Sequence, residues 1–481
     1  MSFRFSILLF ILSFTFFWGC EREYVLQGGS QELSFSTDTV AFDTIFTSIG
    51  SATQNFRVYN PVQEDVIIDA VELAGGDDSD FIINVNGIAE SMVYDVPVRG
   101  NDSLFVFVEV NVNPTIENSP FVVSDSIFFY IRNQIYTIHL LAYGQNVIPF
   151  RKDTLKTQKL TNDKPYLIYD WVIVDTTETL TIEPGTRLHF HKDASLIVFG
   201  SLQVNGEVDA PVTFTSDRLD EWYKDKPGQW GYIQLMPGSR DHVISNAVIS
   251  NGTMGLVVDS VGIEEEHPPL FLNNVRIEHI ASQGLIAQNS VIVASNSVFG
   301  DCGSASVALT AGGNYKFYHC TIANYFMWNY RSIPALVISN YYYHYTDADN
   351  KIKKYIPLEA ANFYNCIVYG RNNNELKLDL EIDEDKNFSE CANVNFDHTL
   401  LKVQEEIKTA WSHAFGEGVL FNEDPAFVDI NKYNYQLDSA SVARDAGALS
   451  VGRDYPEDIL GNSRTKDKAP DLGAYERVDR Q

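Results

Sequence analysis

The chain is poor in cysteine, with five cysteines in 481 residues. No two of them form a CxxC pair or show the spacing of a zinc site, so the sequence offers no motif for a zinc centre. Cys302, Cys320, Cys366 and Cys391 are spread over the second half of the chain. The first three fall at matched or nearly matched points of a repeat, which favours buried, stacked thiols. In an exported protein the four could instead pair as disulfides.

Basic residues are also scarce, because 35 Lys and Arg face 64 Asp and Glu and the formal charge is −29. The field of such a protein repels phosphate backbones and anionic lipid surfaces, so we expect no nucleic-acid partner. An acidic surface also disfavours anionic polysaccharides unless calcium or a local basic patch intervenes. The charge therefore counts against a uronate lyase.

An apolar run, "ILLFILSFTFFW", occupies residues 7 to 18. It is too short to span a bilayer comfortably and has the shape of a secretory signal. The run ends at Gly19-Cys20 and resembles a bacterial lipoprotein signal, which implies cleavage before Cys20 and lipidation of that cysteine. The alternative is an ordinary export signal with an incidental Cys20. We expect a signal peptide over residues 1–19 and a lipid anchor and tether over residues 20–30.

Residues 31–148 alternate short apolar and polar patterns with turn clusters. Segments such as "QNFRVYN", "DVIIDAVEL" and "SLFVFVEVNV" place an apolar residue at every second position, which is typical of strands with one buried face. Roughly seven strands in about 115 residues indicate an immunoglobulin-like β-sandwich. The high aromatic content, 25 Tyr and 30 Phe, also favours strands.

A unit of the form Asn/His-x-x-apolar recurs between residues 161 and 440. Its first positions are Asn246, Asn274, Asn296, His319, Asn365 and, in a variant form, Asp397. The intervals are 28, 22, 23, 46 and 32 residues, and 46 is twice 23. A fixed period in this range indicates stacked supersecondary units. Each period fits one coil of a three-faced parallel β-solenoid, with the repeated polar residues aligned as the rungs of a ladder.

His319 and Cys320 in "FYHCTIANY" have the composition of a metal site or an activated nucleophile. The segment "FYNCIVYG" repeats the pattern 46 residues later with Asn365 in place of the histidine. We therefore interpret His319 as a rung of the ladder and Cys320 as a small core residue.

Two segments resemble a known superfamily. They are "GQWGYIQLMPGS" followed by "SNAVISNG", and the closing "NYQLDSASVARDAG" with "DILGNSRTKDKAPDLGAYE". They are similar to the right-handed parallel β-helix proteins of the pectate-lyase-like superfamily. The whole layout resembles a Bacteroidota lipoprotein family, in which the acidic Glu21 and Glu23 imply export to the outer face of the outer membrane. The resemblance implies an all-β protein: an immunoglobulin-like sandwich, then a right-handed parallel β-helix over residues 161–440 and a closing segment over 441–481.

Enzymes of this superfamily need paired acids or a calcium-binding carboxylate cluster. The polygalacturonase-like motifs Asn-Thr-Asp, Asp-Asp, Gly-His-Gly and Arg-Ile-Lys do not occur between residues 161 and 440. Asp397-His398 is similar to a pectate-lyase motif but falls on the ladder. We predict no catalytic residue and no cofactor. If the chain is an enzyme, it is expected to be a polysaccharide lyase or a glycoside hydrolase.

Two insertions interrupt the repeat and are the candidate contact surfaces. The first, residues 215–230, suits a sugar, a protein interface or a loop that caps the first coil. The second, residues 340–355, is rich in tyrosine and lysine and is the strongest candidate. The candidate contact residues are Asp217, Arg218, Trp222, Tyr223, Trp230, Tyr341, Tyr342, Tyr343, His344 and Tyr345. The acidic segment over residues 375–390 is a solvated loop or a weak calcium binder.

The sequence thus predicts a lipoprotein of the outer membrane, anchored by its N-terminal lipid and facing the cell exterior. Its expected function is that of a non-catalytic binding scaffold or an accessory subunit of an outer-membrane protein complex. The alternative is a protein that binds or cleaves polysaccharide near Asp217, Arg218 and Trp222.

Overall fold

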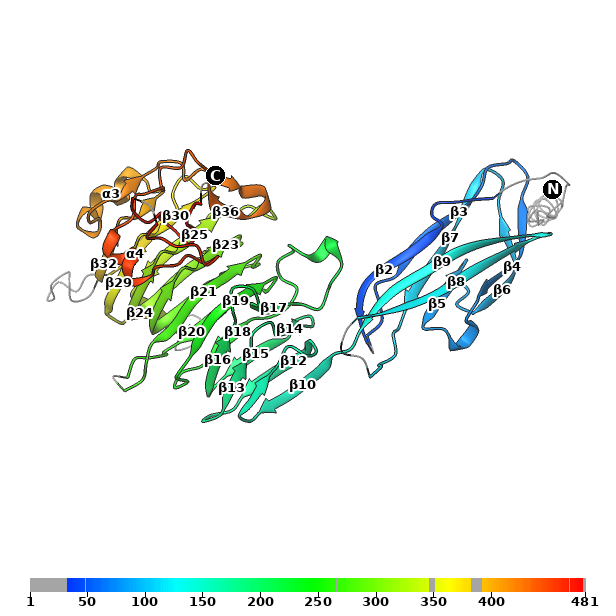
Figure 1. The fold of residues 1–481 in the computed structure, drawn as a ribbon, viewed down its shortest axis with the longest axis horizontal. Coiled ribbons are helices and arrows are strands. Elements are labelled where there is room, and N and C mark those ends of the chain that lie inside the picture. The colour runs from blue at the N-terminus through cyan, green and yellow to red at the C-terminus, as the bar shows by residue number, and fades with distance from the viewer. Residues whose placement is uncertain are drawn as a thin grey trace, which may run out of the picture. The chain divides into compact units, whose positions relative to one another are not determined.

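The computed structural model describes residues 33–47, 49–116, 118, 120–264, 266–345, 351–381, 392–466 and 468–478. The chain divides into two compact units, residues 1–146 and 147–481. Strands make up nearly all the regular structure of both units (Figure 1). Within the described residues, no helix combines the length and the apolarity needed to cross a lipid bilayer.

The first unit holds two sheets. One has the strand order β1-β3-β7-β5, and the other has the order β2-β9-β8-β4-β6. All neighbours in them are antiparallel except β2 and β9, which pair in parallel. The bounds are β1 (Ser34–Phe35), β2 (Thr39–Phe46), β3 (Gln54–Asn60), β4 (Val66–Leu73), η2 (Gly76–Asp78), β5 (Phe81–Val85), β6 (Met92–Val98), β7 (Asp102–Val110), β8 (Phe121–Ile131) and β9 (Gln134–Gln145).

The two sheets share one core. Along β7 the side chains alternate between exposed and buried, as expected of a strand with one face in a core. Phe42 of β2 contacts Phe81 of β5, and Phe56 of β3 contacts Phe129 of β8, with ring centroids 6.0 and 6.1 Å apart. Each of these contacts joins a strand of one sheet to a strand of the other, so the first unit is built as two layers.

The second unit is dominated by one sheet of 23 strands, all paired in parallel. Its strands are β10 (Ile148–Leu155), β11 (Gln158–Leu160), β12 (Tyr166–Val174), β13 (Thr179–Ile182), β14 (Arg187–Phe190), β15 (Ser195–Val198), β16 (Ser201–Asn205), β17 (Val212–Ser216), β18 (Ile233–Leu235), β19 (Val243–Ser250), β20 (Leu256–Asp259), β21 (Leu270–Glu278), β22 (Leu285–Ser295), β23 (Val298–Gly300), β24 (Val307–Tyr318), β25 (Thr321–Asn324), β26 (Leu336–Ser339), β29 (Leu358–Tyr364), β30 (Ile367–Gly370), β31 (Leu376–Asp379), β32 (Ala392–Asp397), β33 (Leu400–Leu401) and β34 (Leu420–Phe421). The sheet begins at β10, ahead of residue 161, where the turn pattern of the sequence changes.

The remaining elements lie outside this sheet. They are η3 (Glu221–Tyr223), the antiparallel pair β27 (Tyr341–Tyr345) and β28 (Lys351–Tyr355), α3 (Glu405–Ala410), η4 (Ser412–Ala414), the pair β35 (Phe427–Asp429) and β36 (Asn434–Leu437) with η5 (Ile430–Lys432) between them, and α4 (Leu449–Asp454).

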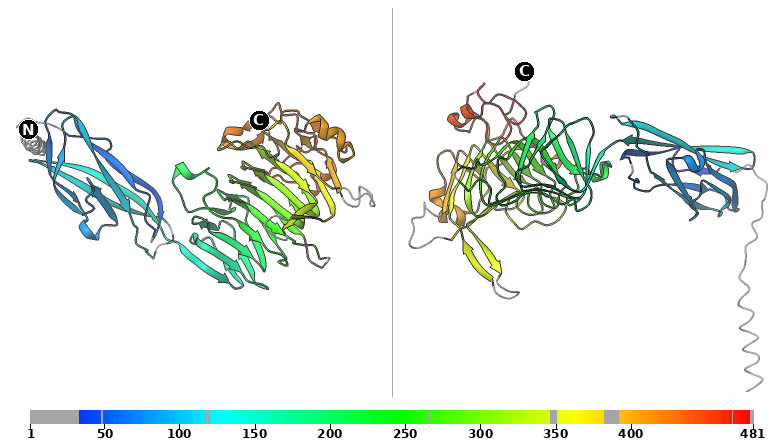
Figure 2. Two further views of the ribbon diagram at one scale, coloured as in Figure 1. Left: turned by 180° about the vertical axis from the view of Figure 1, so that it is seen from behind. Right: turned by 90° about the horizontal axis from the view of Figure 1, so that it is seen from below.

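The strands of the parallel sheet stack in three columns, and Figure 2 shows successive strands lying next to one another along the unit. One column runs β12-β15-β18-β20, a second runs β13-β16-β19-β21, and a third runs β14-β17-β19-β21. Strands β19 and β21 belong to two columns because the chain turns a corner within each of them. The chain therefore returns to each column once per repeat.

The repeated polar residues occupy one corner of this arrangement. Asn246, Asn274, Asn296, His319 and Asn365 are register neighbours on successive repeats, and all have φ between 48° and 55°. Asn and His tolerate this left-handed region better than most residues. The predicted rung Asp397 is wrong by one position, because His398 follows Asn365 in the register and has φ 42°.

The 46-residue interval between His319 and Asn365 is one repeat and not two. Tyr318 pairs directly with Tyr364 in the register of β24 and β29, so no strand of another repeat lies between them. The extra length is taken up by residues 325–335 and by the hairpin of β27 and β28. The interpretation of 46 as twice 23 is therefore corrected.

The core of the second unit contains a stack of phenylalanines on consecutive repeats. The ring centroids of Phe317 and Phe363 are 4.9 Å apart, and those of Phe363 and Phe396 are also 4.9 Å apart, with the rings within 14° of parallel. This spacing follows from the separation of neighbouring strands, which is about 4.8 Å.

Candidate functional site

His319 and Cys320 belong to the packing of the corner. Both are fully buried, and the amide Nδ2 of Asn365 lies 3.1 Å from Nε2 of His319. Burial, with a smaller effect from the charge of Arg464, holds the pKa of His319 well below its usual value. The Cys320 amide donates a hydrogen bond to the Cys366 sulfur at 3.4 Å, and the Cys320 thiol donates to the Tyr318 carbonyl at 3.4 Å. This arrangement agrees with the interpretation of His319 as a rung.

Cys302, Cys320 and Cys366 are free and fully buried. Burial raises the pKa of the Cys302 and Cys366 thiols, so neither is suited to act as a nucleophile at neutral pH. Cys391 and the expected lipidation site Cys20 lie outside the described residues, as does most of the acidic segment over residues 375–390.

The chain after β36 packs along the side of the repeat, over the same corner. The Asn365 amide accepts a hydrogen bond from the Ala448 amide at 2.8 Å and donates to the Ala448 carbonyl at 3.2 Å. The Asn296 amide donates to the Glu457 carbonyl and accepts from the Arg464 guanidinium. These contacts cover the corner at Asn296 and Asn365, which are buried, whereas Asn246 and Asn274 on the earlier repeats are partly exposed.

The first insertion, residues 215–230, is folded upon itself. The Asp217 carboxylate lies 2.6 Å from Nδ1 of His191, and its side chain is 8% exposed. Tyr223 lies between the Arg218 guanidinium and the Lys226 ammonium, which are 3.9 and 4.8 Å from its ring centroid. Trp222 is 73% exposed, and Lys226 lies 3.6 Å from its ring centroid.

Trp230 is fully buried, with its ring stacked on Phe190 at a centroid distance of 4.2 Å. Its indole N–H donates to the Ser250 carbonyl at 2.7 Å. The Trp230 side chain therefore has no exposed surface that a partner could contact. Trp222 is thus the side chain of this insertion that presents a large exposed ring.

The second insertion forms the hairpin of β27 and β28, which extends away from the parallel sheet (Figure 2, right). Tyr342 and Tyr343 are 43% and 42% exposed, and Ile352 on the opposite strand is 48% exposed. Tyr341 is held by the Lys353 ammonium, 3.7 Å from its ring centroid. His344 and Tyr345 belong to β27, but their side chains lie outside the described part of the structure.

A groove that the sequence did not reveal runs between loops of successive repeats. Two cavities of about 610 and 580 Å³ both include Arg371 in their lining. The first is lined by the exposed Tyr330 and by the polar run Asn372 to Asn374, with Gln404 beside them. The second is lined by Tyr325, Tyr369, Lys402, Asp424 and Phe427, among others. The groove therefore offers amides, several aromatic rings and three cationic side chains, those of Arg331, Arg371 and Lys402.

A buried ion pair holds the two walls of the groove together. The Arg331 guanidinium donates to both oxygens of Glu375, at 2.6 and 2.8 Å. The same carboxylate accepts from the Ala335 and Asn372 amides, each at 2.8 Å. Arg331 lies in the loop after β25, and Glu375 lies in the loop after β30. The ion pair therefore sets the distance between these two loops. Of the described residues that line it, Asp424 is the sole acid.

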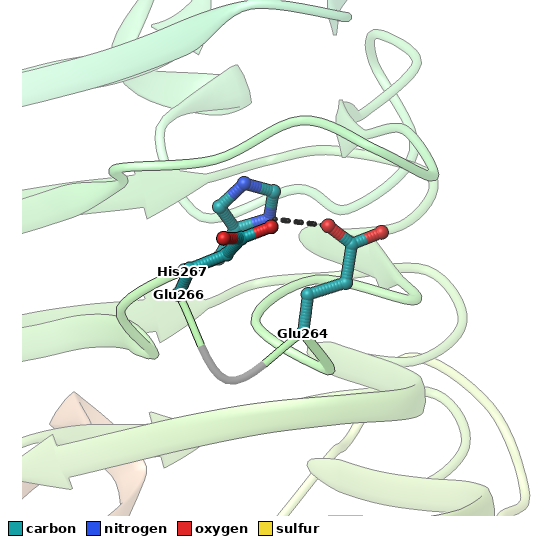
Figure 3. A group of neighbouring side chains, drawn as sticks. All are labelled: Glu264, Glu266 and His267. Atoms are coloured by element: carbon teal, nitrogen blue, oxygen red, sulfur yellow. Dashed lines mark ion pairs between the residues drawn. The ribbon is translucent and has the colours of Figure 1, made fainter.

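One group of side chains has donor atoms close enough to share a metal ion. Glu264, Glu266 and His267 each offer a ligand atom within 4.8 Å of the others (Figure 3). Nδ1 of His267 lies 3.3 Å from a Glu264 oxygen, and the Arg240 guanidinium lies 3.4 Å from Nε2. A guanidinium can only donate, so the proton of a neutral His267 sits on Nδ1 and faces Glu264. Glu264 and Arg240 thus engage the two ring nitrogens of His267.

The Asp397-His398 pair lies at the corner described above. Nδ1 of His398 is 2.6 Å from the Asp397 carboxylate, and both side chains are about one quarter exposed. Glycoside hydrolysis needs two carboxyl groups that flank the scissile bond, and this pair supplies one.

No protein-family model matches the chain, and no curated protein matches it. Solved structures with partial likeness include a family 123 glycoside hydrolase from Clostridium perfringens, studied for glycolipid glycan hydrolysis. It is 7% identical over 24% of this chain and 26% of that chain, with a TM-score of 0.18. This chain thus spans about a quarter of the length of the hydrolase.

Another is PapD-like domain 7 of human CEP192. It is 10% identical over 27% of this chain and 96% of that chain, with a TM-score of 0.17. Likeness at this level carries no conclusion about function.

Proposed function

We propose that the chain is a surface lipoprotein of the outer membrane that binds a partner without catalysis. In this proposal the two-layered first unit is an immunoglobulin-like domain, and the three-column sheet is a right-handed parallel β-helix of the pectate-lyase-like kind. The return of the chain to each column once per repeat supports the β-helix. The apolar run that ends at Cys20 supports the lipid anchor.

The hairpin of β27 and β28 is the observation that carries the binding function. Its two strands pair only with each other among the described strands, and it presents Tyr342, Tyr343 and Ile352 to solvent. Exposed tyrosines on a projecting element favour a protein interface, since aromatic side chains supply much of the binding energy at such surfaces. The exposed Lys354 adds a positive charge to this surface, whereas Lys353 is paired with Glu381. We infer that the partner is another protein of the outer membrane, to which this chain is an accessory subunit.

Affinity purification from detergent-solubilised membranes tests this function. The wild-type chain should recover a stoichiometric outer-membrane protein, and a variant with Tyr342→Ser and Tyr343→Ser should lose it. Tyr94→Ser is the matched control, because Tyr94 is 64% exposed but lies in the first unit. Repeated recovery of the chain alone, or equal recovery by the hairpin variant, contradicts the proposal.

The anchor is tested separately. Cys20→Ser should abolish incorporation of labelled palmitate and release the protein from the membrane fraction. Protease treatment of intact cells should degrade the wild-type protein if it faces the exterior. A palmitate-labelled Cys20→Ser protein would show that the anchor lies elsewhere.

Polysaccharide binding is the second candidate, and the groove favours it. Amide groups and aromatic rings are the side chains that bind neutral sugars, because they combine hydrogen bonding with flat apolar surfaces. Hydrolysis by the usual route needs two carboxyl groups. Asp424 is the single acid among the described lining residues, which supports binding over cleavage.

Affinity electrophoresis against a panel of polysaccharides separates the groove from the first insertion. Tyr330→Ala or Arg371→Ala should weaken binding about tenfold if the groove is the site, as expected for the loss of an aromatic or charged anchor. Trp222→Ala should leave binding unchanged. The reverse pattern would place the site at residues 215–230. Release of reducing ends or of unsaturated uronate, abolished by Asp424→Asn, would make the chain an enzyme.

A further inference from the structure

His279 lies where three parts of the second unit meet. It follows β21 at φ 57°, and its side chain is 8% exposed. Asp301 is its register neighbour on the next repeat, since Ile280 pairs with Cys302, and Asp301 also has a positive φ of 48°. Asn251 precedes them in the same column at φ 67°. The three residues form a second corner, away from the one that carries His319.

Two carboxylates face the two nitrogens of this imidazole. Nδ1 of His279 lies 2.6 Å from Oδ2 of the fully buried Asp301. Nε2 lies 3.7 Å from Oδ1 of Asp225, which belongs to the first insertion and is 46% exposed. The ring of Tyr433, from the link between η5 and β36, packs edge-on against the imidazole at a centroid distance of 4.4 Å. One side chain therefore contacts the sheet, the insertion and the C-terminal part of the chain.

The other charged and titratable groups near this histidine are Glu278, Tyr433 and Tyr435. Glu278 is mostly buried and paired with the Arg276 guanidinium at 2.8 Å. Burial and the charges of Asp301 and Asp225 raise the pKa of Tyr433 to about 12, so it stays neutral at physiological pH. The same cause, burial above all, raises the pKa of Tyr435. The charges that act on the pKa of His279 are those of Glu278, Asp301 and Asp225.

Protonation of His279 decides whether Asp225 is attracted or repelled. The imidazolium donates from both nitrogens and can pair with both carboxylates at once. A neutral ring that keeps its proton on Nδ1 for Asp301 turns a lone pair toward the Asp225 oxygen. Two acceptors then face each other, and the contact becomes unfavourable.

We propose that His279 is a proton-dependent latch that holds the first insertion, residues 215–230, through Asp225, against the sheet beside Tyr433. The imidazolium closes the latch, and loss of its proton frees the turn at Asp225, while the Asn251 amide still donates to the Lys224 and Lys226 carbonyls at 2.8 and 3.0 Å. This inference is independent of the proposed binding function.

The direction of the pH dependence follows from the surroundings of the ring. Burial lowers the pKa of His279, but the hydrogen bond to Asp301 and the charges of Glu278, Asp301 and Asp225 outweigh it, so the pKa is raised above the ordinary 6.5. A histidine whose pKa is raised on folding stabilises the folded contact below its unfolded pKa and loses that effect as the pH rises through the folded value. The latch is therefore closed below about pH 6.5 and opens as the pH rises through the raised pKa of His279.

Hydrogen–deuterium exchange of the full chain tests the latch locally. His279→Asn keeps a residue suited to the left-handed corner, as Asn251 does on the preceding repeat, and removes the titration. At about pH 6 the wild-type peptide over residues 217–230 should exchange about threefold more slowly than in His279→Asn, and at about pH 9 the two should be equal. A ratio that does not change with pH contradicts the proposal, because a purely structural role of His279 predicts a constant ratio.

Asp225→Asn is the second variant, and it is expected to fold because Asp225 is half exposed. Its peptide over residues 217–230 should be less protected than wild type at about pH 6 and equal at about pH 9. Asp220→Asn is the matched control, since it removes the same charge from the same insertion but pairs with Arg218, 3.6 Å away. An equal effect of the two substitutions would overturn the latch.

Discussion

Arg331 and Glu375 form a two-fold hydrogen-bonded ion pair although 44 residues separate them in the chain. The exposed fractions of their side chains are 3% and 0%. The carboxylate also accepts two backbone amides, from Ala335 and Asn372. The hydrogen bonds to the Glu375 carboxylate replace those it would make with water, so the buried charge is compensated. The pair also joins the loops that line the groove.

Loss of one partner of this pair should destabilise the second unit strongly. Arg331→Met leaves the Glu375 carboxylate buried and unpaired, which costs about 3 to 5 kcal/mol of unfolding free energy. Tryptophan fluorescence in urea measures this, because five of the six tryptophans lie in the second unit and the sixth is Trp18 in the predicted signal peptide.

Two variants sharpen that measurement. Arg371→Met, on the exposed wall of the groove, should change the unfolding free energy by about 0.5 kcal/mol or less. Combining Arg331→Met with Glu375→Leu should restore part of the loss, since no charge is then left unpaired. Equal stability of Arg331→Met and Arg371→Met would show that the pair is not a structural tie.

The repeat could be predicted from the sequence because its cause is local. A corner that requires a positive φ selects Asn or His at each turn of the chain, as at Asn246, Asn274 and His319, and apolar strand residues follow it at a fixed distance. The same logic also marks the second corner at Asn251, His279 and Asp301, where the change of residue type from one repeat to the next hid the pattern.

The groove could not be predicted, because no short segment contains it. Tyr330, Asn373, Gln404 and Asp424 come from loops on different repeats and meet only once the columns have formed. The burial of Trp230 is equally non-local, since it depends on Phe190, 40 residues earlier. A tryptophan at the end of an insertion gives no sign of which way its ring will turn.

Replacing Asn365 should lower the stability of the corner that carries His319. Asn365→Ala removes two hydrogen bonds with Ala448 and one contact with His319, and it places an alanine at φ 54°. We expect a loss of about 3 kcal/mol in the same urea experiment, from the hydrogen bonds and the strained backbone together.

Asn289→Ala is the control that measures the cost of the strained backbone alone. Asn289 has φ 41° at a bulge in β22 and is partly exposed. It should cost about 1 kcal/mol. If both substitutions cost the same, the side-chain contacts of Asn365 contribute nothing, and the ladder is a consequence of backbone geometry only.

The buried thiols should resist modification in the folded chain. Cys302, Cys320 and Cys366 are fully buried, and burial raises the pKa of Cys302 and Cys366. Iodoacetamide reacts with thiolates, so peptide mass spectrometry should find these three positions unmodified in native buffer and modified in urea. Rapid native alkylation of Cys320 or Cys366 would show that this part of the core opens readily.

Acid should destabilise the second unit through two buried neutral histidines. Burial lowers the pKa of His189 and of His242 from 6.5 to about 4. The Leu202 amide donates to Nδ1 of His242, and Nε2 lies 2.9 Å from the Ser239 hydroxyl, so the neutral ring fits its surroundings without an added proton. Because the unfolded chain binds these protons first, stability is full above about pH 6.5 and falls as the pH drops toward 4.

His242→Gln should reduce this loss, by on the order of 3 kcal/mol between about pH 6.5 and pH 4, because one such proton is then no longer taken up on unfolding. Urea unfolding followed by tryptophan fluorescence at several pH values measures the slope. His413→Gln is the matched control, since His413 is exposed, and it should leave the slope unchanged. The sign is opposite to that of His279, whose pKa is raised above 6.5. Replacing His242 therefore flattens the acid limb, whereas replacing His279 removes a contribution that is lost as the pH rises through the raised pKa. A His242→Gln protein with the wild-type acid limb would mean that the ring is already protonated in the folded state.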